Sequence, residues 1–245
     1  MEELNEKRIQ AALADPTLPV SVLQSVDSTS SECRRRLAAG ETRCLILAEQ
    51  QTAGRGRQGK EFFSPAGRGL YLSLMFSPVG GIPAADGFTS YAAVCVRRAI
   101  RAACGIECGI KWVNDLFYHG RKVCGILTEA VGETLIAGVG IDLLSGDLPA
   151  ELESIAGALD CSCDRCALAA AITNGLLAWA PSARDFWTEY RSASIVLGRH
   201  IRFLHQGGEQ TGLAVNLTAD GRLIAETENG RICLNSGEIS LLGYE

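Results

Sequence analysis

The sequence predicts an α+β fold, in which helices flank a mixed, mainly antiparallel central sheet and a small β-barrel module follows. Three observations support this prediction. Residues 109–142 contain strand-like segments separated by turn residues, as in antiparallel hairpins. Residues 84–104 place apolar side chains at helical spacing. From residue 195 onward, short strands alternate with glycine turns. We therefore expect a larger domain over residues 1–192 and a small all-β domain over residues 193–245.

The composition is that of an ordinary globular protein. Of the 245 residues, 47% are hydrophobic and 21% are charged. The net charge of −5 argues against general nucleic-acid binding, which normally requires a basic domain. The N-terminus has no apolar core of the signal-peptide type, and no apolar run reaches membrane-spanning length. We expect a cytoplasmic protein that binds neither nucleic acid nor membrane.

Apolar periodicity and capping residues assign the elements of the N-terminal half. Asp27 to Thr29 are good helix-capping types, and Gly40 is a good stop for the helix between them. The expected elements, in order, are a helix within residues 1–16, a strand Val20–Val26, a helix from Thr29 to Gly40, strands Cys44–Glu49 and Leu70–Phe76, a turn Gly80–Pro83 and a long helix over residues 84–104.

The C-terminal half is assigned in the same way. Pro181 should end the second of its helices, because proline cannot continue a helix. The expected elements are strands Lys111–Val113, Lys122–Val131 and Leu135–Ile141, a helix starting near Leu152, Ile155 and Leu159, a helix Ala167–Ala178, a short helix Asp185–Arg191 and then the β module.

A basic glycine loop lies between the second and third expected strands. Within seven residues, glycines at 54, 56 and 59 alternate with Arg55, Arg57 and Lys60, so a flexible backbone carries three cations. The glycines match G-x-G-x-x-G, but a strand follows instead of the helix that a dinucleotide loop opens. Guanidinium groups in such a loop suit phosphate or carboxylate. A solvated basic hairpin turn would have the same composition.

Residues 109–142 form the second informative stretch. Polar and charged residues of this stretch would lie on neighbouring elements, namely Lys111, Asn114, Asp115 and Lys122. A single charged side chain usually just faces solvent. Gly138 and Gly140 within a strand, in the segment GVGID, indicate a backbone left bare for the approach of a ligand.

The ten cysteines are scattered along the chain, which favours free thiols. The exception is the cluster Cys161, Cys163 and Cys166 in DCSCDRC. Three thiols at this spacing can bind zinc, but tetrahedral structural sites need a fourth ligand. No paired Cys or His cluster follows, so we expect a loop that leads into a helix.

Seven motifs in order resemble those of biotin protein ligases. They are VDSTSS, EQQTAGRGRQGKEFFSP, GLYLSL, KWVNDL, GRKVCGILTE, GVGID and GEISL, spread from Val26 to Leu241. The resemblance implies a class II synthetase-like biotin/lipoate ligase fold. It also implies an ATP-dependent enzyme that makes biotinyl-5′-AMP and transfers biotin to a lysine of a biotin carboxyl carrier protein, in acetyl-CoA carboxylase or a related carboxylase. Only 26 residues precede Asp27, so we expect the short form without a DNA-binding domain, as a monomer or homodimer.

The resemblance also implies the roles of individual residues. Lys122, Arg55 and Arg57 would be catalytic, and Mg²⁺ would enter with ATP, near Asp115 and without a protein-only cage. The implied biotin-binding residues are Ser28, Thr29, Gln51, Gly54, Arg55, Arg57, Lys122, Gly125, Gly138 and Gly140. The implied ATP and adenylate residues are Arg57, Lys60, Phe62, Lys111, Asn114, Asp115 and Asp142.

Three positions depart from the family pattern. Val113 stands where proline is usual, Asp142 replaces an asparagine near the adenine, and Leu242 follows GEISL where arginine is common. Two alternatives remain: a lipoate or octanoate ligase, which would carry an RRxSGGG-type loop and a nearby histidine, and a non-catalytic biotin sensor. Asp142 favours the sensor, whereas the intact Arg55, Arg57 and Lys122 argue against it.

Overall fold

The structure is a computed structural model, and it describes residues 2–82, 87–180, 185–218, 220–235 and 239–242. Its centre is a seven-stranded sheet that is mixed and mainly antiparallel, as predicted, because only β1 and β2 pair in parallel. The order across the sheet is β1 (Val20–Val26), β2 (Cys44–Gln51), β3 (Gly69–Phe76), β7 (Thr134–Asp142), β6 (Arg121–Val131), β5 (Asp115–Tyr118) and β4 (Gly109–Lys111).

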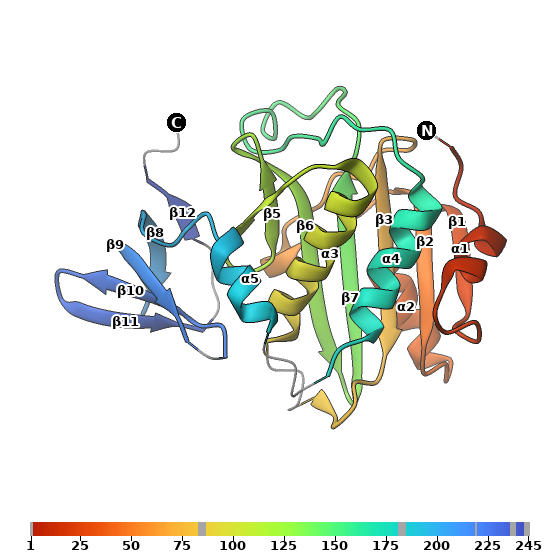
Figure 1. Cartoon of the computed structure of the whole chain (residues 1–245), viewed down its shortest axis with the longest axis horizontal. Helices are drawn as coiled ribbons and strands as arrows, with labels where there is room; N and C mark the ends of the chain where they lie inside the picture. The colour runs from red at the N-terminus through yellow and green to blue at the C-terminus, as the bar shows by residue number, and fades with distance from the viewer. Residues whose placement is uncertain (1, 83–86, 181–184, 219, 236–238, 243–245) are drawn as a thin grey trace.

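Helices cover both faces of the sheet (Figure 1). α3 (Phe88–Cys104) and α4 (Arg165–Leu177) pack side by side on one face, with α1 (Glu6–Ala12) beside α4. α2 (Thr29–Ala38) packs on β2, β3 and β7. The two faces follow from alternation along β2, where Leu45 and Leu47 join the large core and Ile46 joins the smaller core under α2. None of the helices in the described ranges is long and apolar enough to cross a membrane.

The C-terminal module is an antiparallel sheet of five strands that lies beyond α5 (Phe186–Ala193), at the left of Figure 1. Its described strands are ordered β11 (Gly230–Leu234), β10 (Leu223–Thr227), β9 (Gly208–Leu217), β8 (His200–His205) and β12 (Ile239–Leu241). Their pairing leaves β11 and β12 as edges, so these strands do not close into the barrel that we expected. The indole N–H of Trp112 donates to the Gly221 carbonyl at 2.9 Å and joins the module to the central sheet.

The expected helix near Leu152, Ile155 and Leu159 is wrong, because residues 150–155 form turns, Ala156 makes an isolated bridge with Lys122, and residues 157–159 have no regular structure. Their backbone groups bond to strands of the sheet instead: Lys122 N–H donates to the Ile155 carbonyl, and Leu159 N–H donates to the Asp142 carbonyl, both at 2.9 Å. The apolar spacing did not mark a buried face, since Ile155 is exposed. Residues 109–142 also contain one strand more than expected, β5. The start of the helix expected at residue 84, Pro83, Pro181, and Gly237 and Glu238 of GEISL lie outside the described residues.

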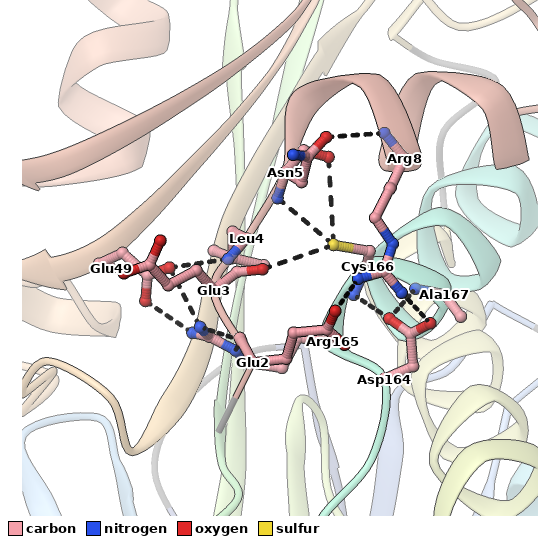
Figure 2. A network of polar contacts seen from close by, with 10 residues as sticks. All are labelled: Glu2, Glu3, Leu4, Asn5, Arg8, Glu49, Asp164, Arg165, Cys166 and Ala167. Atoms are coloured by element: carbon pink, nitrogen blue, oxygen red, sulfur yellow. Dashed lines mark hydrogen bonds and ion pairs between the residues drawn. The ribbon is translucent and has the colours of Figure 1, made fainter.

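A buried ion pair joins the N-terminal segment, β2 and α4 (Figure 2). The guanidinium of Arg165 is 2% exposed and donates to both carboxylate oxygens of Glu49, at 2.8 and 3.0 Å. It also donates to the carbonyls of Glu2 and Gly69, and Leu4 N–H donates to Glu49 at 2.9 Å. This network fixes the end of β2 from which the glycine loop departs, and the start of β3 to which the loop returns.

Candidate active site

A cavity of about 550 Å³ opens between the N-terminus of α2, the glycine loop, strands β5 to β7 and the turns of residues 148–156. This volume lies in the range of small-molecule sites. The cavity is lined by every predicted site residue except Gly54: Ser28, Thr29, Gln51, Arg55, Arg57, Lys60, Phe62, Lys111, Asn114, Asp115, Lys122, Gly125, Gly138, Gly140 and Asp142. Residues from six elements and two loops therefore meet at one place.

Hydroxyl and amide groups gather at the α2 end of the cavity. Ser28 is the N-cap residue of α2, and both the N–H and the hydroxyl of Thr29 donate to Gln51 Oε1, at 2.8 and 3.1 Å. The Ser73 hydroxyl on β3 bonds the hydroxyls of Thr29 and Ser30, at 2.7 and 2.9 Å. Sequence reasoning did not assign Ser30 or Ser73 to the site, although both stand inside quoted motifs, VDSTSS and GLYLSL.

Gly138 and Gly54 have distinct local reasons to be glycine. A Cβ atom on Gly138 would lie 2.7 Å from the Ser30 hydroxyl, so the bare backbone makes room for this hydroxyl cluster. A Cβ atom on Gly54 would lie 2.3 Å from the Phe62 carbonyl and 2.8 Å from the Ser64 hydroxyl. Gly54 thus allows the loop to fold back on itself, with Phe62 N–H donating to the Gly54 carbonyl at 2.9 Å.

Arg55 is tied to the sheet. Its guanidinium donates to both carboxylate oxygens of Glu129 on β6, at 3.2 and 2.9 Å, and Arg34 of α2 bonds the same carboxylate at 2.8 Å. Two cations share one carboxylate, and the glycine loop, α2 and β6 are held together by it. The geometry therefore assigns Arg55 an anchoring contact, at the wall of the cavity.

Arg57, Asn114, Asp115 and Lys122 form a continuous polar chain along the opposite wall. Arg57 donates to Asn114 Oδ1 at 3.0 Å, and Asn114 Nδ2 donates to Asp115 Oδ1 at 3.0 Å and to the Ile126 carbonyl at 2.8 Å. Lys122 Nζ lies 2.9 Å from Asp115 Oδ1. The amide of Asn114 is buried and held on both sides, so it fixes the positions of the two cations at the ends of the chain.

Phe62 lies on two facing glycines. Gly125 and Gly140 are register partners on β6 and β7, and Cβ atoms there would lie 3.2 and 2.5 Å from carbons of the Phe62 ring. The ring also meets Tyr71 edge-to-face, with centroids 6.4 Å apart. Only glycine at position 140 leaves space for the ring in this position, so the Phe62 ring lies against the bare backbone of the two strands inside the cavity.

Asp142 ends β7 on the cavity wall, opposite Gly69 of β3. Burial raises the pKa of its carboxyl to about 7, while the positive charge of Lys122 acts in the opposite direction. At neutral pH the carboxyl is therefore divided between a protonated form, which donates a hydrogen bond, and a carboxylate, which only accepts.

The donor groups of the polar chain fit a hard cation held mostly by a substrate. Asp115 and Asn114 offer oxygen atoms, which Mg²⁺ prefers, and Mg²⁺ is usually bound by one or two carboxylates together with phosphates. Within the described ranges, the cavity shows no cluster of three or more His, Cys, Asp or Glu residues at metal-binding spacing. A magnesium ion here would need phosphate oxygens as its remaining ligands.

Comparison with known proteins gives matches over most of the chain. The biotin/lipoate A/B protein ligase family model matches residues 22–143, and the model of the biotin protein ligase C-terminal domain matches residues 196–242. The bifunctional ligase/repressor BirA of Bacillus spizizenii is 33% identical over 236 residues, which cover 90% of this chain and 72% of that protein. The biotin–[acetyl-CoA-carboxylase] ligase of Mycobacterium tuberculosis is 27% identical over 235 residues, which cover 90% of this chain and 88% of that protein.

Solved structures give the same result. The biotin protein ligase from Aquifex aeolicus in complex with biotin and ATP superimposes with a TM-score of 0.77 at 28% identity, over 91% of this chain and 98% of that one.

Proposed function

Because the chain belongs to the biotin protein ligase family, we propose that its cavity binds biotin and ATP side by side and that Arg57 and Lys122 act on the reacting groups. The protein is an ATP-dependent biotin ligase, which joins biotin to AMP and then to an acceptor lysine. The observation that carries the assignment of roles is the single cavity, which has hydroxyl and amide groups at one end and the Arg57 to Lys122 chain along its wall.

The hydroxyl end suits the ureido ring of biotin. That ring carries one carbonyl acceptor and two N–H donors, which are costly to bury without partners. Ser28, Thr29 and Gln51 supply hydroxyl and amide groups at this end, and Ser73 holds the Thr29 hydroxyl in place. Gly138 keeps the neighbouring strand free of a side chain there.

The cationic wall suits the reacting anions. In the first step the biotin carboxylate attacks the α-phosphate of ATP, and pyrophosphate leaves. Two like unit charges about 4 Å apart repel by roughly 4 kcal/mol at an effective dielectric constant near 20. Lys122 and Arg57, placed beforehand by Asp115 and Asn114, offset this repulsion without reorganising during the reaction. Asp115 and Asn114 would hold Mg²⁺ with the phosphates, where the ion neutralises phosphate charge.

The remaining predicted residues have supporting roles in this proposal. Lys60 and Lys111 lie at the cavity wall, where they would face the nucleotide phosphates, and Asp142 would face the base. Phe62, resting on Gly125 and Gly140, would move with the glycine loop to cover the adenylate and exclude water from its hydrolysable anhydride.

Biotin ligases act on biotin carboxyl carrier proteins of carboxylases. We propose that the acceptor of this enzyme is the carrier of acetyl-CoA carboxylase or a related carboxylase, and that the enzyme works in the cytoplasm as a monomer or homodimer. The names of two relatives, biotin–[acetyl-CoA-carboxylase] ligases from Mycobacterium tuberculosis and Paracoccus denitrificans, support this acceptor.

The deciding experiment is ATP–pyrophosphate exchange with biotin, lipoate, octanoate or no acid in the presence of Mg²⁺. Exchange with biotin alone is expected, because the C-terminal match is to biotin ligases and the loop GRGRQGK lacks the RRxSGGG pattern. Exchange with the fatty acids instead would assign the chain to lipoate or octanoate ligation. Biotin binding without exchange would identify a sensor and direct attention to Asp142.

A further inference from the structure

Three cysteine side chains from two distant segments meet in the structure. Cys104 is the last residue of α3, whereas Cys161 and Cys163 lie in the segment that leads into α4. Their sulfur atoms all lie within 4.8 Å of one another, and Sγ of Cys161 is 2.7 Å from Sγ of Cys104. In the parts of the chain that the structure describes, no other group of three His, Cys, Asp or Glu side chains has metal-binding spacing.

The membership of this cluster differs from the one read from DCSCDRC. Cys166 belongs to the first turn of α4, which Asp164 caps, and its sulfur accepts from Asn5 N–H at 3.4 Å (Figure 2). The third thiol comes instead from Cys104, fifty-seven residues earlier in the chain. Cys104 therefore takes the place of Cys166, and within the described residues the cluster has three protein ligands and no fourth.

We propose that Cys104, Cys161 and Cys163 bind one thiophilic d¹⁰ cation, Zn²⁺ or Cu⁺, through three thiolates. Thiolate ligands select soft cations of this kind. With metal–sulfur bonds of about 2.3 Å, sulfurs at tetrahedral angles lie about 3.8 Å apart. The sulfurs of Cys104 and Cys161, which are 2.7 Å apart, would therefore have to separate by about 1 Å when the cation binds. All three side chains are half-buried, which leaves the fourth position of Zn²⁺ for water, or a three-coordinate site for Cu⁺.

Binding exchanges protons for the metal. A bound cation holds its coordinating thiols deprotonated. Each sulfur binds the cation as a thiolate, any proton that it carries passes to solvent, and neither sulfur nor metal changes oxidation state. Affinity therefore increases with pH.

A metal at this site would connect the segment that follows residues 148–156 of the cavity wall to the end of α3. Residues 148–156 line the cavity, and the chain then returns along the end of β7, where Leu159 N–H donates to the Asp142 carbonyl at 2.9 Å and Cys161 N–H donates to the Leu143 carbonyl at 3.2 Å. A metal bound at Cys161 and Cys163 fixes the end of this segment. This inference depends on the cluster itself and not on the proposed roles of the cavity residues.

The test uses the full chain, purified with a reductant and stripped of metal. Zn²⁺ and Cu⁺ are titrated separately against chromophoric chelators, and one equivalent of one of them should bind tightly. Ser replacements of Cys104, Cys161 or Cys163 should each weaken binding at least about 100-fold, more than the loss of an outer partner of a ligand costs. Cys166→Ser, and Cys233→Ser at an exposed position, are matched controls that should bind as the unchanged protein does.

X-ray absorption of the unchanged protein avoids any dependence on variants that fold poorly, and it should show three sulfur ligands at about 2.3 Å. The proposal is overturned if the reduced protein binds neither cation, or if the bound cation has fewer than three sulfur ligands. It is equally overturned if Cys104 and Cys161 form a disulfide and the reduced protein takes up no metal, which would identify a redox pair instead.

Discussion

Lys122 and Asp115 hold each other across the β5–β6 hairpin, with Nζ 2.9 Å from Oδ1 and both side chains partly exposed to the cavity. The carboxylate is also bonded by the amide of Asn114, so it holds the ammonium group in one position before substrate arrives. A charge placed in advance in this way stabilises a transition state without reorganisation.

Replacing Lys122 by alanine should therefore slow adenylation while leaving the fold intact, since 28% of the side chain is exposed. We expect single-turnover formation of biotinyl-5′-AMP to fall about 10²- to 10³-fold, as for the loss of one preorganised electrostatic group. Lys7→Ala, an exposed lysine on α1, is the matched control. Unchanged adenylation by the Lys122 variant would remove this residue from the mechanism.

The bidentate pair of Arg55 and Glu129 anchors the glycine loop, so its loss should affect biotin binding. Arg55→Ala and Glu129→Gln should each weaken biotin binding, by about tenfold, and the double variant should be no worse than either, since coupled residues are not additive. Calorimetric titration with biotin measures this. A large loss of turnover in Arg55→Ala that Glu129→Gln does not share would instead mean that Arg55 acts directly on the reacting anions.

The buried Arg165–Glu49 pair should contribute strongly to the free energy of unfolding. Removing one partner of a buried ion pair leaves an uncompensated charge, so Glu49→Ala should lower the free energy of unfolding by about 3 to 5 kcal/mol. Burial opposes ionisation of Glu49, but Arg165 and the Leu4 N–H outweigh it and lower its pKa. This stabilisation is complete above the ordinary carboxyl range and is lost as pH falls through the lowered pKa.

Urea unfolding of Glu49→Ala at pH 7 and at pH 3 measures both effects. The exposed pair between Arg231 and Glu226 is the control, because solvated pairs contribute little. Equal stability of Glu49→Ala and the unchanged protein at pH 7 would contradict the prediction.

Much of this architecture could be predicted from local sequence. Alternating or continuous apolar runs marked β2, β3 and β7, and Gly105, which is left-handed at φ 69°, marked the end of α3. The irregular structure of residues 150–159 could not be predicted, because their apolar residues have the spacing of a helix. Their backbone is instead held by hydrogen bonds to Lys122 and Asp142, which lie on strands of the central sheet.

The composition of the site was predictable because its residues stand in seven motifs, but their pairings were not. The local sequence does not show that Glu129 pairs with Arg55, or that Ser73 bonds the Thr29 hydroxyl. The residues of each pair are far apart in the sequence and are brought together only by the sheet. The loop that leads into a helix at residues 161–166 was predicted correctly. The contact of Cys104 with Cys161 could not be predicted, because the two residues are brought together only by the fold.

The buried carboxyl of Asp142 should make the stability of the protein depend on pH. Its carboxyl pKa is raised to about 7 in the folded protein, mainly by burial. An acid with a raised folded pKa costs no stability below its ordinary pKa, and the cost grows as pH rises towards 7 and then stays constant. Asp142→Asn removes that cost, so it should raise the free energy of unfolding of the ligand-free protein at pH 8. A rise of about three pKa units at about 1.4 kcal/mol each gives about 4 kcal/mol.

At pH 4 the same variant should match the unchanged protein, since both then carry an uncharged group at position 142. Denaturant unfolding at the two pH values distinguishes this prediction from a packing effect, which would be equal at both. The affinity for ATP should also depend on whether the Asp142 carboxyl is protonated. Only the protonated carboxyl offers both a hydrogen-bond donor and an acceptor, whereas the amide of asparagine offers both at every pH. Tighter ATP binding by Asp142→Asn at pH 8, with little difference at pH 6, would place this carboxyl at the base; a pH-independent difference would exclude it.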